Sequence, residues 1–297
     1  MTSKSLLLLF TTFVIFVTGI QGQEKVTDFP VLRGPYLGQK PPGTSPKKFF
    51  TDELNAAMPF KCHFLPAFSQ DGNKMCWAHD GEKFQIFFSE TIDGKWIKPY
   101  RPSFAGAENE NSPLFSLDGE TIYFLSFKKS GYIFEAKRTG HEWSKPVGLD
   151  VRIPPSLGRG WFFSISKNKT LYLELWKDRK PKIYKAKNIN NKYEQFDMVQ
   201  FELDENSLEM APYINKDEQY LIFSSIKDNG FGSFDLYIMF RNSDDSWTSP
   251  INMGNKINTS SDENAAFVSL DERYLFFSRR GEIYWVSAEI IEELRPK

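Results

Sequence analysis

The chain has 297 residues, of which 40% are hydrophobic and 25% are charged, with 37 basic and 38 acidic side chains. A chain of this length and composition can bury enough apolar surface to fold, which excludes a disordered protein. Its formal charge of -1 leaves no excess of basic side chains to hold phosphates, so we expect no nucleic acid among its partners.

The first 22 residues have the organisation of a secretory signal peptide. Lys4 supplies a positive charge, residues 6–17 form an apolar run, and small residues follow up to Gly22. The run is shorter than the roughly 20 residues that a membrane span needs, although an uncleaved anchor is the alternative. We therefore expect an exported protein, periplasmic or extracellular, with a signal peptide over 1–22, an N-terminal extension over 23–45 and no membrane span after cleavage.

Five segments repeat along the chain, and each contains a strand, a tight turn and a second strand. The turn residues recur roughly every 50 residues, at Asp71, Asp118, Asn168, Asp217 and Asp271. A third strand with an aliphatic residue beside an aromatic one follows each turn. A fourth strand begins at Trp96, Trp143, Tyr193 and Trp247.

Repeats of four short antiparallel strands are typical of a β-propeller, in which each blade packs against its neighbours. We predict an all-β propeller over residues 46–290, with five four-stranded blades. Six blades are the alternative, which the Pro and Gly content of residues 24–62 disfavours. The fifth repeat lacks a fourth strand, so we expect residues 46–52 to complete the last blade and close the ring. A short helix over 288–294 and a tail over 291–297 end the chain.

Short sequence motifs within the repeats resemble those of a known family. Residues 113–126 read PLFSLDGETIYFLS, and similar patterns occur in the segment from Asn258, in the loop NGFGSFDLY from Asn229 and in EIYWVSAEIIEEL from Glu282. These segments resemble the TolB-type, WD-like β-propeller repeat family of exported bacterial proteins. The first repeat departs with Ala78 and His79 at the strand end, and the third with Asn168 and Lys169 in the turn. The resemblance implies a propeller and mostly a binding or scaffold role.

One position in each repeat, eight residues before the turn residue, is expected at the mouth of the central channel. It holds His63, Glu110, Gly160, Glu209 and Glu263, and Arg159 adjoins the gap in the third repeat. Converging carboxylates and a histidine could bind calcium through oxygen ligands, or a polar ligand such as a sugar or a peptide terminus. The interpretation we favour is that the recurrent glutamates bond backbone amides and specify the repeat. His63 and Arg159, which break the repeat, are then the better ligand-binding candidates.

An enzymatic alternative uses the same residues. Two carboxylates among Glu110, Glu209 and Glu263 could serve as the acid and base of a secreted glycoside hydrolase or lyase. The chain contains no GxSxG, GxGxxG, P-loop or HExxH motif, which leaves serine-hydrolase, nucleotide and zinc-protease functions unsupported. We therefore expect a non-enzymatic module that binds a protein or glycan ligand and needs no cofactor, with calcium as the alternative.

The tryptophans divide into two groups. Trp96, Trp143 and Trp247 recur once per repeat, which favours packing between blades over carbohydrate stacking. Trp161 and Trp176 lie in the atypical third repeat, outside this rule. These two are the better candidates for an exposed platform, and we expect Trp161 to contact a ligand.

Cys62 and Cys76 are the two cysteines of the chain. An exported protein can keep a disulfide, so a bond between them is one expectation. A tight turn at Asp71 and Gly72 would instead place Ala67 opposite Cys76. The competing expectation is therefore two small buried thiols.

Overall fold

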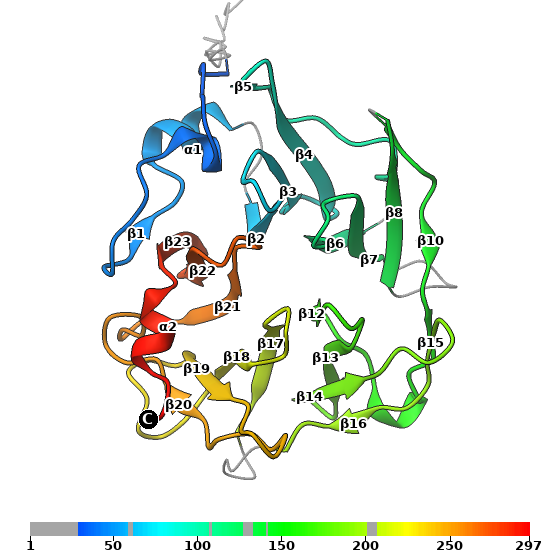
Figure 1. Ribbon diagram of the computed structural model, residues 1–297, viewed down its shortest axis with the longest axis vertical. Helices are drawn as coiled ribbons and strands as arrows, with labels where there is room; N and C mark the ends of the chain where they lie inside the picture. Colours follow the sequence, from blue (N-terminus) through cyan, green and yellow to red (C-terminus); the bar gives the residue numbers. More distant parts are fainter. Residues whose placement is uncertain (1–28, 59–61, 107–108, 127–132, 141, 201–206) are drawn as a thin grey trace, which may run out of the picture.

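The computed structural model describes residues 29–58, 62–106, 109–126, 133–140, 142–200 and 207–297. The prediction of a signal peptide over 1–22 lies outside the described residues. The all-β fold is confirmed, with five blades arranged around a central axis (Figure 1). No helix in the described ranges is both long and apolar enough to cross a membrane.

The five blades follow one another along the chain. Blade 1 contains β2 (Cys62–Phe68), β3 (Lys74–His79), β4 (Gln85–Ile92) and β5 (Lys95–Trp96). Blade 2 contains β6 (Glu110–Phe115), β7 (Thr121–Ser126) and β8 (Ile133–Thr139), and both β9 (Glu142–Trp143) and β10 (Val147–Gly148) pair with β8. Blade 3 contains β12 (Phe163–Ile165), β13 (Leu171–Lys177), β14 (Lys180–Ala186) and β16 (Asp197–Met198).

Blades 4 and 5 complete the ring. Blade 4 contains β17 (Glu209–Ile214), β18 (Tyr220–Ser225), β19 (Asp235–Phe240) and β20 (Ile251–Asn252). Blade 5 contains β21 (Glu263–Val268), β22 (Tyr274–Arg279), β23 (Glu282–Ser287) and β1 (Lys47–Lys48). The remaining elements are η1 (Tyr36–Gly38), α1 (Asp52–Ala57), β11 (Asp150–Val151) paired in parallel with β15 (Lys192–Tyr193), η2 (Pro155–Leu157) and α2 (Glu289–Glu293).

The last blade combines both ends of the chain. Strand β1 pairs antiparallel with β23, with Lys47 opposite Trp285 and Lys48 opposite Tyr284. An early segment therefore supplies the outer strand that the fifth repeat lacks. Such pairing covers an edge that would otherwise present unpaired backbone groups.

The hydrophobic core is divided into five clusters, one between each pair of neighbouring blades. The last apolar residue of each innermost strand points into the seam with the preceding blade, and these residues are Phe68, Phe115, Ile165, Ile214 and Val268. Trp96 and Trp143 are buried in these clusters and Trp247 packs against one, which confirms their packing role.

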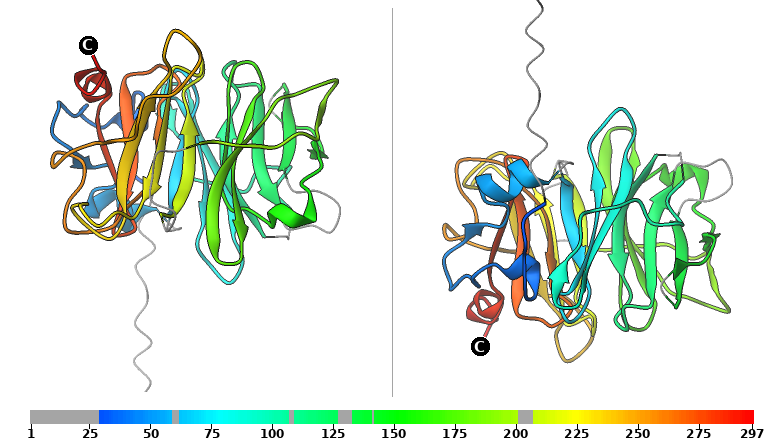
Figure 2. Two further views of the ribbon diagram at one scale, coloured as in Figure 1. Left: turned by 90° about the horizontal axis from the view of Figure 1, so that it is seen from below. Right: turned by 90° about the horizontal axis from the view of Figure 1, so that it is seen from above.

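Segments outside the blades close two of the seams. Tyr36 inserts between blades 5 and 1, where its ring lies 5.1 Å from those of Phe68 and Tyr274. On the neighbouring seam, α2 buries Ile290 and Ile291 between blades 4 and 5. This helix confirms the helical ending predicted over 288–294. In the side views of Figure 2 the strands of each blade run between the two faces of the ring.

The structure has no disulfide between Cys62 and Cys76. The expectation of a bond is therefore wrong, and the two side chains are thiols, as the competing expectation had it. Cys62 lies opposite His79 and packs on the core between blades 5 and 1. Cys76 lies opposite Ala67, as predicted from the turn, and belongs to the core between blades 1 and 2. The two side chains therefore serve opposite faces of the blade 1 sheet, a geometry that a disulfide cannot bridge.

Candidate functional site

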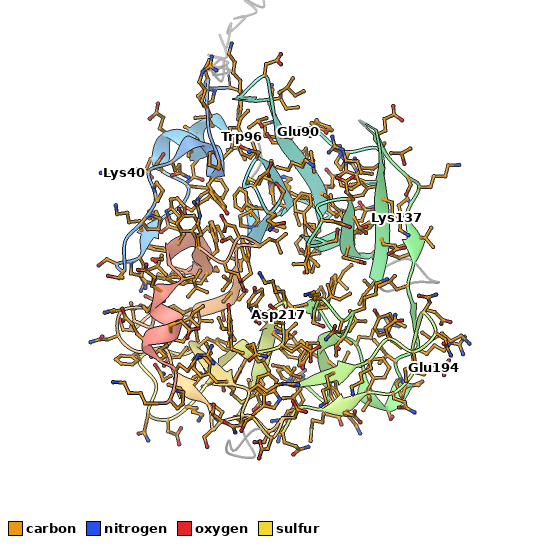
Figure 3. The ribbon with its side chains drawn as sticks, in the orientation of Figure 1. Lys40, Glu90, Trp96, Lys137, Glu194 and Asp217 are labelled. Carbon is orange, nitrogen blue, oxygen red and sulfur yellow. The ribbon has the colours of Figure 1, made fainter. Side chains whose placement is uncertain are left out.

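A cavity of about 700 Å³ occupies the centre of the ring. All five innermost strands line it, and its volume lies within the range of small-ligand sites. One face of the ring carries the turns that follow these strands, and we call it the turn face. The opposite face, where the strands begin at Glu110, Glu209 and Glu263, is the glutamate face. Asp217, labelled near the centre of the ring in Figure 3, belongs to the turn face.

The cavity wall is largely apolar. Partly exposed side chains line it from each blade, namely Leu65, Leu114, Phe162, Tyr213 and Phe267. Asn111 is buried to 2% exposure and adds an amide to the wall, with its oxygen accepting the Ser112 N–H at 2.7 Å. Such a wall favours a ligand that is mainly apolar with few polar groups.

The three predicted glutamates do not line this cavity, because their carboxylates turn back into the protein. Glu110 accepts the Gly106 N–H at 2.9 and 3.1 Å on its two oxygens. Glu263 accepts the Thr259 N–H at 2.9 Å and the Arg279 Nε–H at 2.8 Å. Both side chains are at most 2% exposed.

Glu209 has a comparable environment in blade 4. It accepts a hydrogen bond from the Ser207 hydroxyl, and its second oxygen lies 2.7 Å from the Lys182 ammonium. The three glutamates therefore make the contacts with nearby loops that a residue specifying the repeat would make. Their hydrogen-bond partners differ from blade to blade, while their burial does not.

The other candidates lie apart from the glutamates. Arg159 is exposed, and its backbone forms a bridge with Trp176. Trp161 is 45% exposed, and its carbonyl accepts a hydrogen bond from the Ser112 hydroxyl at 3.1 Å. Ser112 and Phe162 line the cavity and Trp161 does not, so the backbone of Trp161 adjoins the cavity while its side chain lies outside the lining. His63 belongs to β2, and its side chain lies outside the description.

The described part of the chain contains no group of three or more His, Cys, Asp or Glu residues placed to hold a metal ion. Calcium binding stays a prediction that the described residues do not test further.

The cavity extends beyond the central channel into the seam between blades 2 and 3. Tyr123, Glu135 and Lys137 line it from blade 2, and Phe163 and Ile165 from blade 3. Strand β12 has three residues, whereas β6, β17 and β21 have six. The shorter strand covers less of the seam, and its Ile165 is only partly buried.

The turn of blade 3 stands at the turn-face end of this seam. In blade 1 the turn aspartate Asp71 accepts a hydrogen bond from Ser69 at 2.6 Å. The corresponding Ser166 of blade 3 instead donates to Glu218 of blade 4 at 2.8 Å, and the turn carries Lys167 and Lys169. Both lysines line the cavity. Neither lysine was predicted as a site residue from the sequence, although the departure from the repeat at Asn168 and Lys169 marked the place.

Comparison with known proteins identifies the fold. A putative TolB from Agrobacterium tumefaciens is 13% identical, and the match has a TM-score of 0.52 and covers 75% of this chain and 70% of that one. The fold is a TolB-like β-propeller. TolB from Acinetobacter baumannii matches at 13% identity and a TM-score of 0.48 over 75% of this chain. The matched part spans 54% of the length of that protein.

A thermostable family-43 glycoside hydrolase is another structural neighbour, at 13% identity, a TM-score of 0.47, and coverage of 77% of this chain and 90% of that one. No protein-family model and no curated protein matches the chain. At these identities the likeness shows the fold alone. The site of the TolB-like propeller is therefore argued from its own side chains.

Proposed function

We propose that this protein is an exported, non-enzymatic binding module that takes a protein segment or a small ligand into its central cavity. The observation that carries the proposal is the cavity of about 700 Å³ with its mainly apolar wall. Burial of apolar surface drives association, and a concave wall maximises it. Export rests on the signal-peptide pattern over residues 1–22, and the destination is periplasmic or extracellular.

The carbohydrate-active alternative needs an acid and a base carboxylate on either side of a glycosidic bond. The carboxylates considered for this role already bind loop and side-chain donors, and they belong to Glu110, Glu209 and Glu263. Their burial at 2% exposure or less leaves little surface for a sugar. These contacts support a binding role for the TolB-like propeller.

The test is a thermal-shift screen of the protein expressed with its own N-terminus, against apolar peptides, neutral amphiphiles, glycans, and calcium with and without a chelator. A ligand that binds only the native state raises the melting temperature. Leu114→Trp, which narrows the cavity, should reduce the shift, and the exposed Ile189→Trp should preserve it. A shift that is undiminished in Leu114→Trp would place the ligand elsewhere and contradict the proposal.

A turnover assay on the same glycans addresses the alternative directly. The variants to assay are Glu110→Gln, Glu209→Gln and Glu263→Gln. If one of them loses turnover and keeps its melting temperature, the protein is an enzyme and the proposed binding function is wrong.

A further inference from the structure

The seam between blades 2 and 3 combines an apolar interior with a basic entrance. Leu114 and Ile165 contribute partly exposed aliphatic side chains, and Tyr123 lies between the two sheets at 9% exposure. Ile165 occupies the place that Ile214 fills in blade 4, yet Ile214 is 2% exposed. The seam thus leaves apolar surface uncovered that the next seam buries.

Three acidic side chains line the cavity, namely Asp118, Glu120 and Glu135. Asp118 accepts hydrogen bonds from the Ser116 hydroxyl and the Glu120 N–H, which hold its carboxylate toward its own turn. Glu135 lies 3.3 Å from the ammonium of Lys137 on the same strand. Two of the three carboxylates are therefore engaged within blade 2.

The basic side chains of blade 3 are less engaged. The Lys167 ammonium lies 3.8 Å from Asp217, a distance at the limit of an ion pair, and both groups are largely exposed. For Lys169 no ion pair or hydrogen bond of the side chain is recorded among the described residues, and it lines the cavity. Basic side chains thus outnumber acidic ones in the lining of the cavity, with Lys137, Arg138, Lys167, Lys169 and Lys216 against Asp118, Glu120 and Glu135.

Lys169 holds its position at a conformational cost that blades 4 and 5 also bear. Its φ is +59°, at the turn position where blades 1 and 2 have Gly72 (φ +67°) and Gly119 (φ +71°), and where blades 4 and 5 have Glu218 (φ +58°) and Glu272 (φ +60°). The left-handed region disfavours a side chain other than glycine. Glycine would therefore suit the turn, and among these five turn positions blade 3 is the one with a basic side chain.

We propose that the seam between blades 2 and 3 binds the carboxylate end of a small, largely apolar ligand, with Lys167 and Lys169 receiving the carboxylate and Leu114, Tyr123 and Ile165 contacting the apolar part. The proposal rests on the proposed function and names the ligand chemistry of that cavity. A fatty acid and the C-terminus of an apolar peptide share this chemistry. The charge is complementary to the two lysines, and the apolar part covers the surface that the seam leaves open.

The experiment compares matched probes by isothermal titration of the full protein. Decanoate and decanol differ in the carboxylate, and an apolar tripeptide acid and its C-terminal amide differ in the same way. Decanoate should bind about tenfold more tightly than decanol, because a charge-assisted hydrogen bond contributes that much. The advantage should shrink as the salt concentration rises. The peptide pair shows whether the carboxylate is recognised on a peptide or only on an aliphatic chain.

Lys169→Gly separates binding from stability. It should reduce the preference for decanoate, since Lys167 remains, leave decanol binding unchanged, and keep or raise the melting temperature, since glycine suits the turn. Lys40→Ala changes an exposed lysine on the opposite side of the ring and should preserve the preference (Figure 3).

The possible results separate the two proposals. Equal affinity for acid and neutral probes in both pairs overturns the carboxylate site but leaves the binding module intact. A preference for decanoate that is undiminished in Lys169→Gly also overturns it. No binding of any probe, together with no shift in the wider thermal screen, overturns both.

Discussion

The carboxylate of Glu174 accepts a hydrogen bond from the backbone N–H of Ala211 at 2.7 Å, and this bond joins blade 3 to blade 4. In the following pair of blades the hydroxyl of Ser224 accepts the N–H of Ala265 at 3.1 Å. Both donors have positive φ in an irregular stretch of an innermost strand, and both acceptors lie late in the second strand of the preceding blade. A side chain of one blade thus satisfies a buried amide of the next.

Glu174→Ala should lower the free energy of unfolding by about 1 to 3 kcal/mol, because it leaves the buried Ala211 N–H without an acceptor. Urea denaturation measures the change. Glu174→Ser introduces the residue that blade 4 uses at the equivalent position, so it should recover part of the loss. Equal stability of the Ala variant and the parent protein would show that the amide finds another partner.

Glu174 should also make stability depend on pH. Burial raises the pKa of its carboxyl, and the bonds from Trp176 and Ala211 oppose this only in part. Above the unfolded value near 4.5 the unfolded chain has released this proton while the folded protein still holds it, so stability falls as pH rises through that window. Urea midpoints between pH 4 and 7 should therefore fall more steeply for the parent protein than for Glu174→Ser. Parallel curves would contradict the raised pKa.

The glutamates of the innermost strands should differ in their importance for stability. Glu263→Gln leaves Arg279, whose side chain is 18% exposed, without its charged partner and should cost about 3 kcal/mol. Glu110→Gln keeps an oxygen that can accept the Gly106 N–H, so about 1 kcal/mol is expected. Chemical denaturation of both variants measures the free energy of unfolding and shows which variant loses more. The reverse order would indicate that the amide contact, not the ion pair, carries the stabilisation.

Gly232 should tolerate no side chain. A Cβ atom there would lie 2.0 Å from the Ser261 carbonyl oxygen, because the loop after β18 packs against the loop before β21. Gly232→Ala is expected to cost about 3 kcal/mol, at the upper end of overpacking effects, as measured by thermal or urea unfolding. Gly43 has open space at its Cβ position, so Gly43→Ala serves as the neutral control.

Both thiols should be unreactive in the folded protein. Burial raises the pKa of Cys62 and of Cys76, which lowers the fraction of reactive thiolate. Alkylation without reductant, followed by mass spectrometry, should show no addition to native protein and two additions after unfolding in urea. Failure to alkylate the unfolded chain would reveal a disulfide and contradict the free cysteines.

Much of the blade architecture could be predicted because it is encoded over short distances. The turn at Asp71 and Gly72 and the alternation of the flanking strands place Ala67 opposite Cys76, as the structure shows. The recurrence of Trp96 and Trp143 likewise indicated packing between blades, and both are buried. Such features depend on residues close in sequence, whose local conformational preferences agree with the fold.

The site depended on relations that no single repeat contains. The position of Glu110, Glu209 and Glu263 at the strand starts was predictable, but whether a carboxylate faces the channel or a loop is decided by the donors that other segments bring near. The lysine turn of blade 3 was visible as a departure from the repeat. That these lysines line a cavity could not be predicted from the repeat, because the cavity extends between the sheets of two neighbouring blades.

By itself the sequence determined five repeats of alternating strands and tight turns. Each repeat contains its own turn residues and its own alternation of apolar and polar residues, and both are local features of the sequence. Only the tertiary structure decided which faces meet in the seams, how Tyr36 enters the core between blades 5 and 1, and where the cavity opens beside Lys169. The reason is that burial in a ring depends on contacts between blades far apart along the chain, and the repeat pattern does not specify how closely two blades pack.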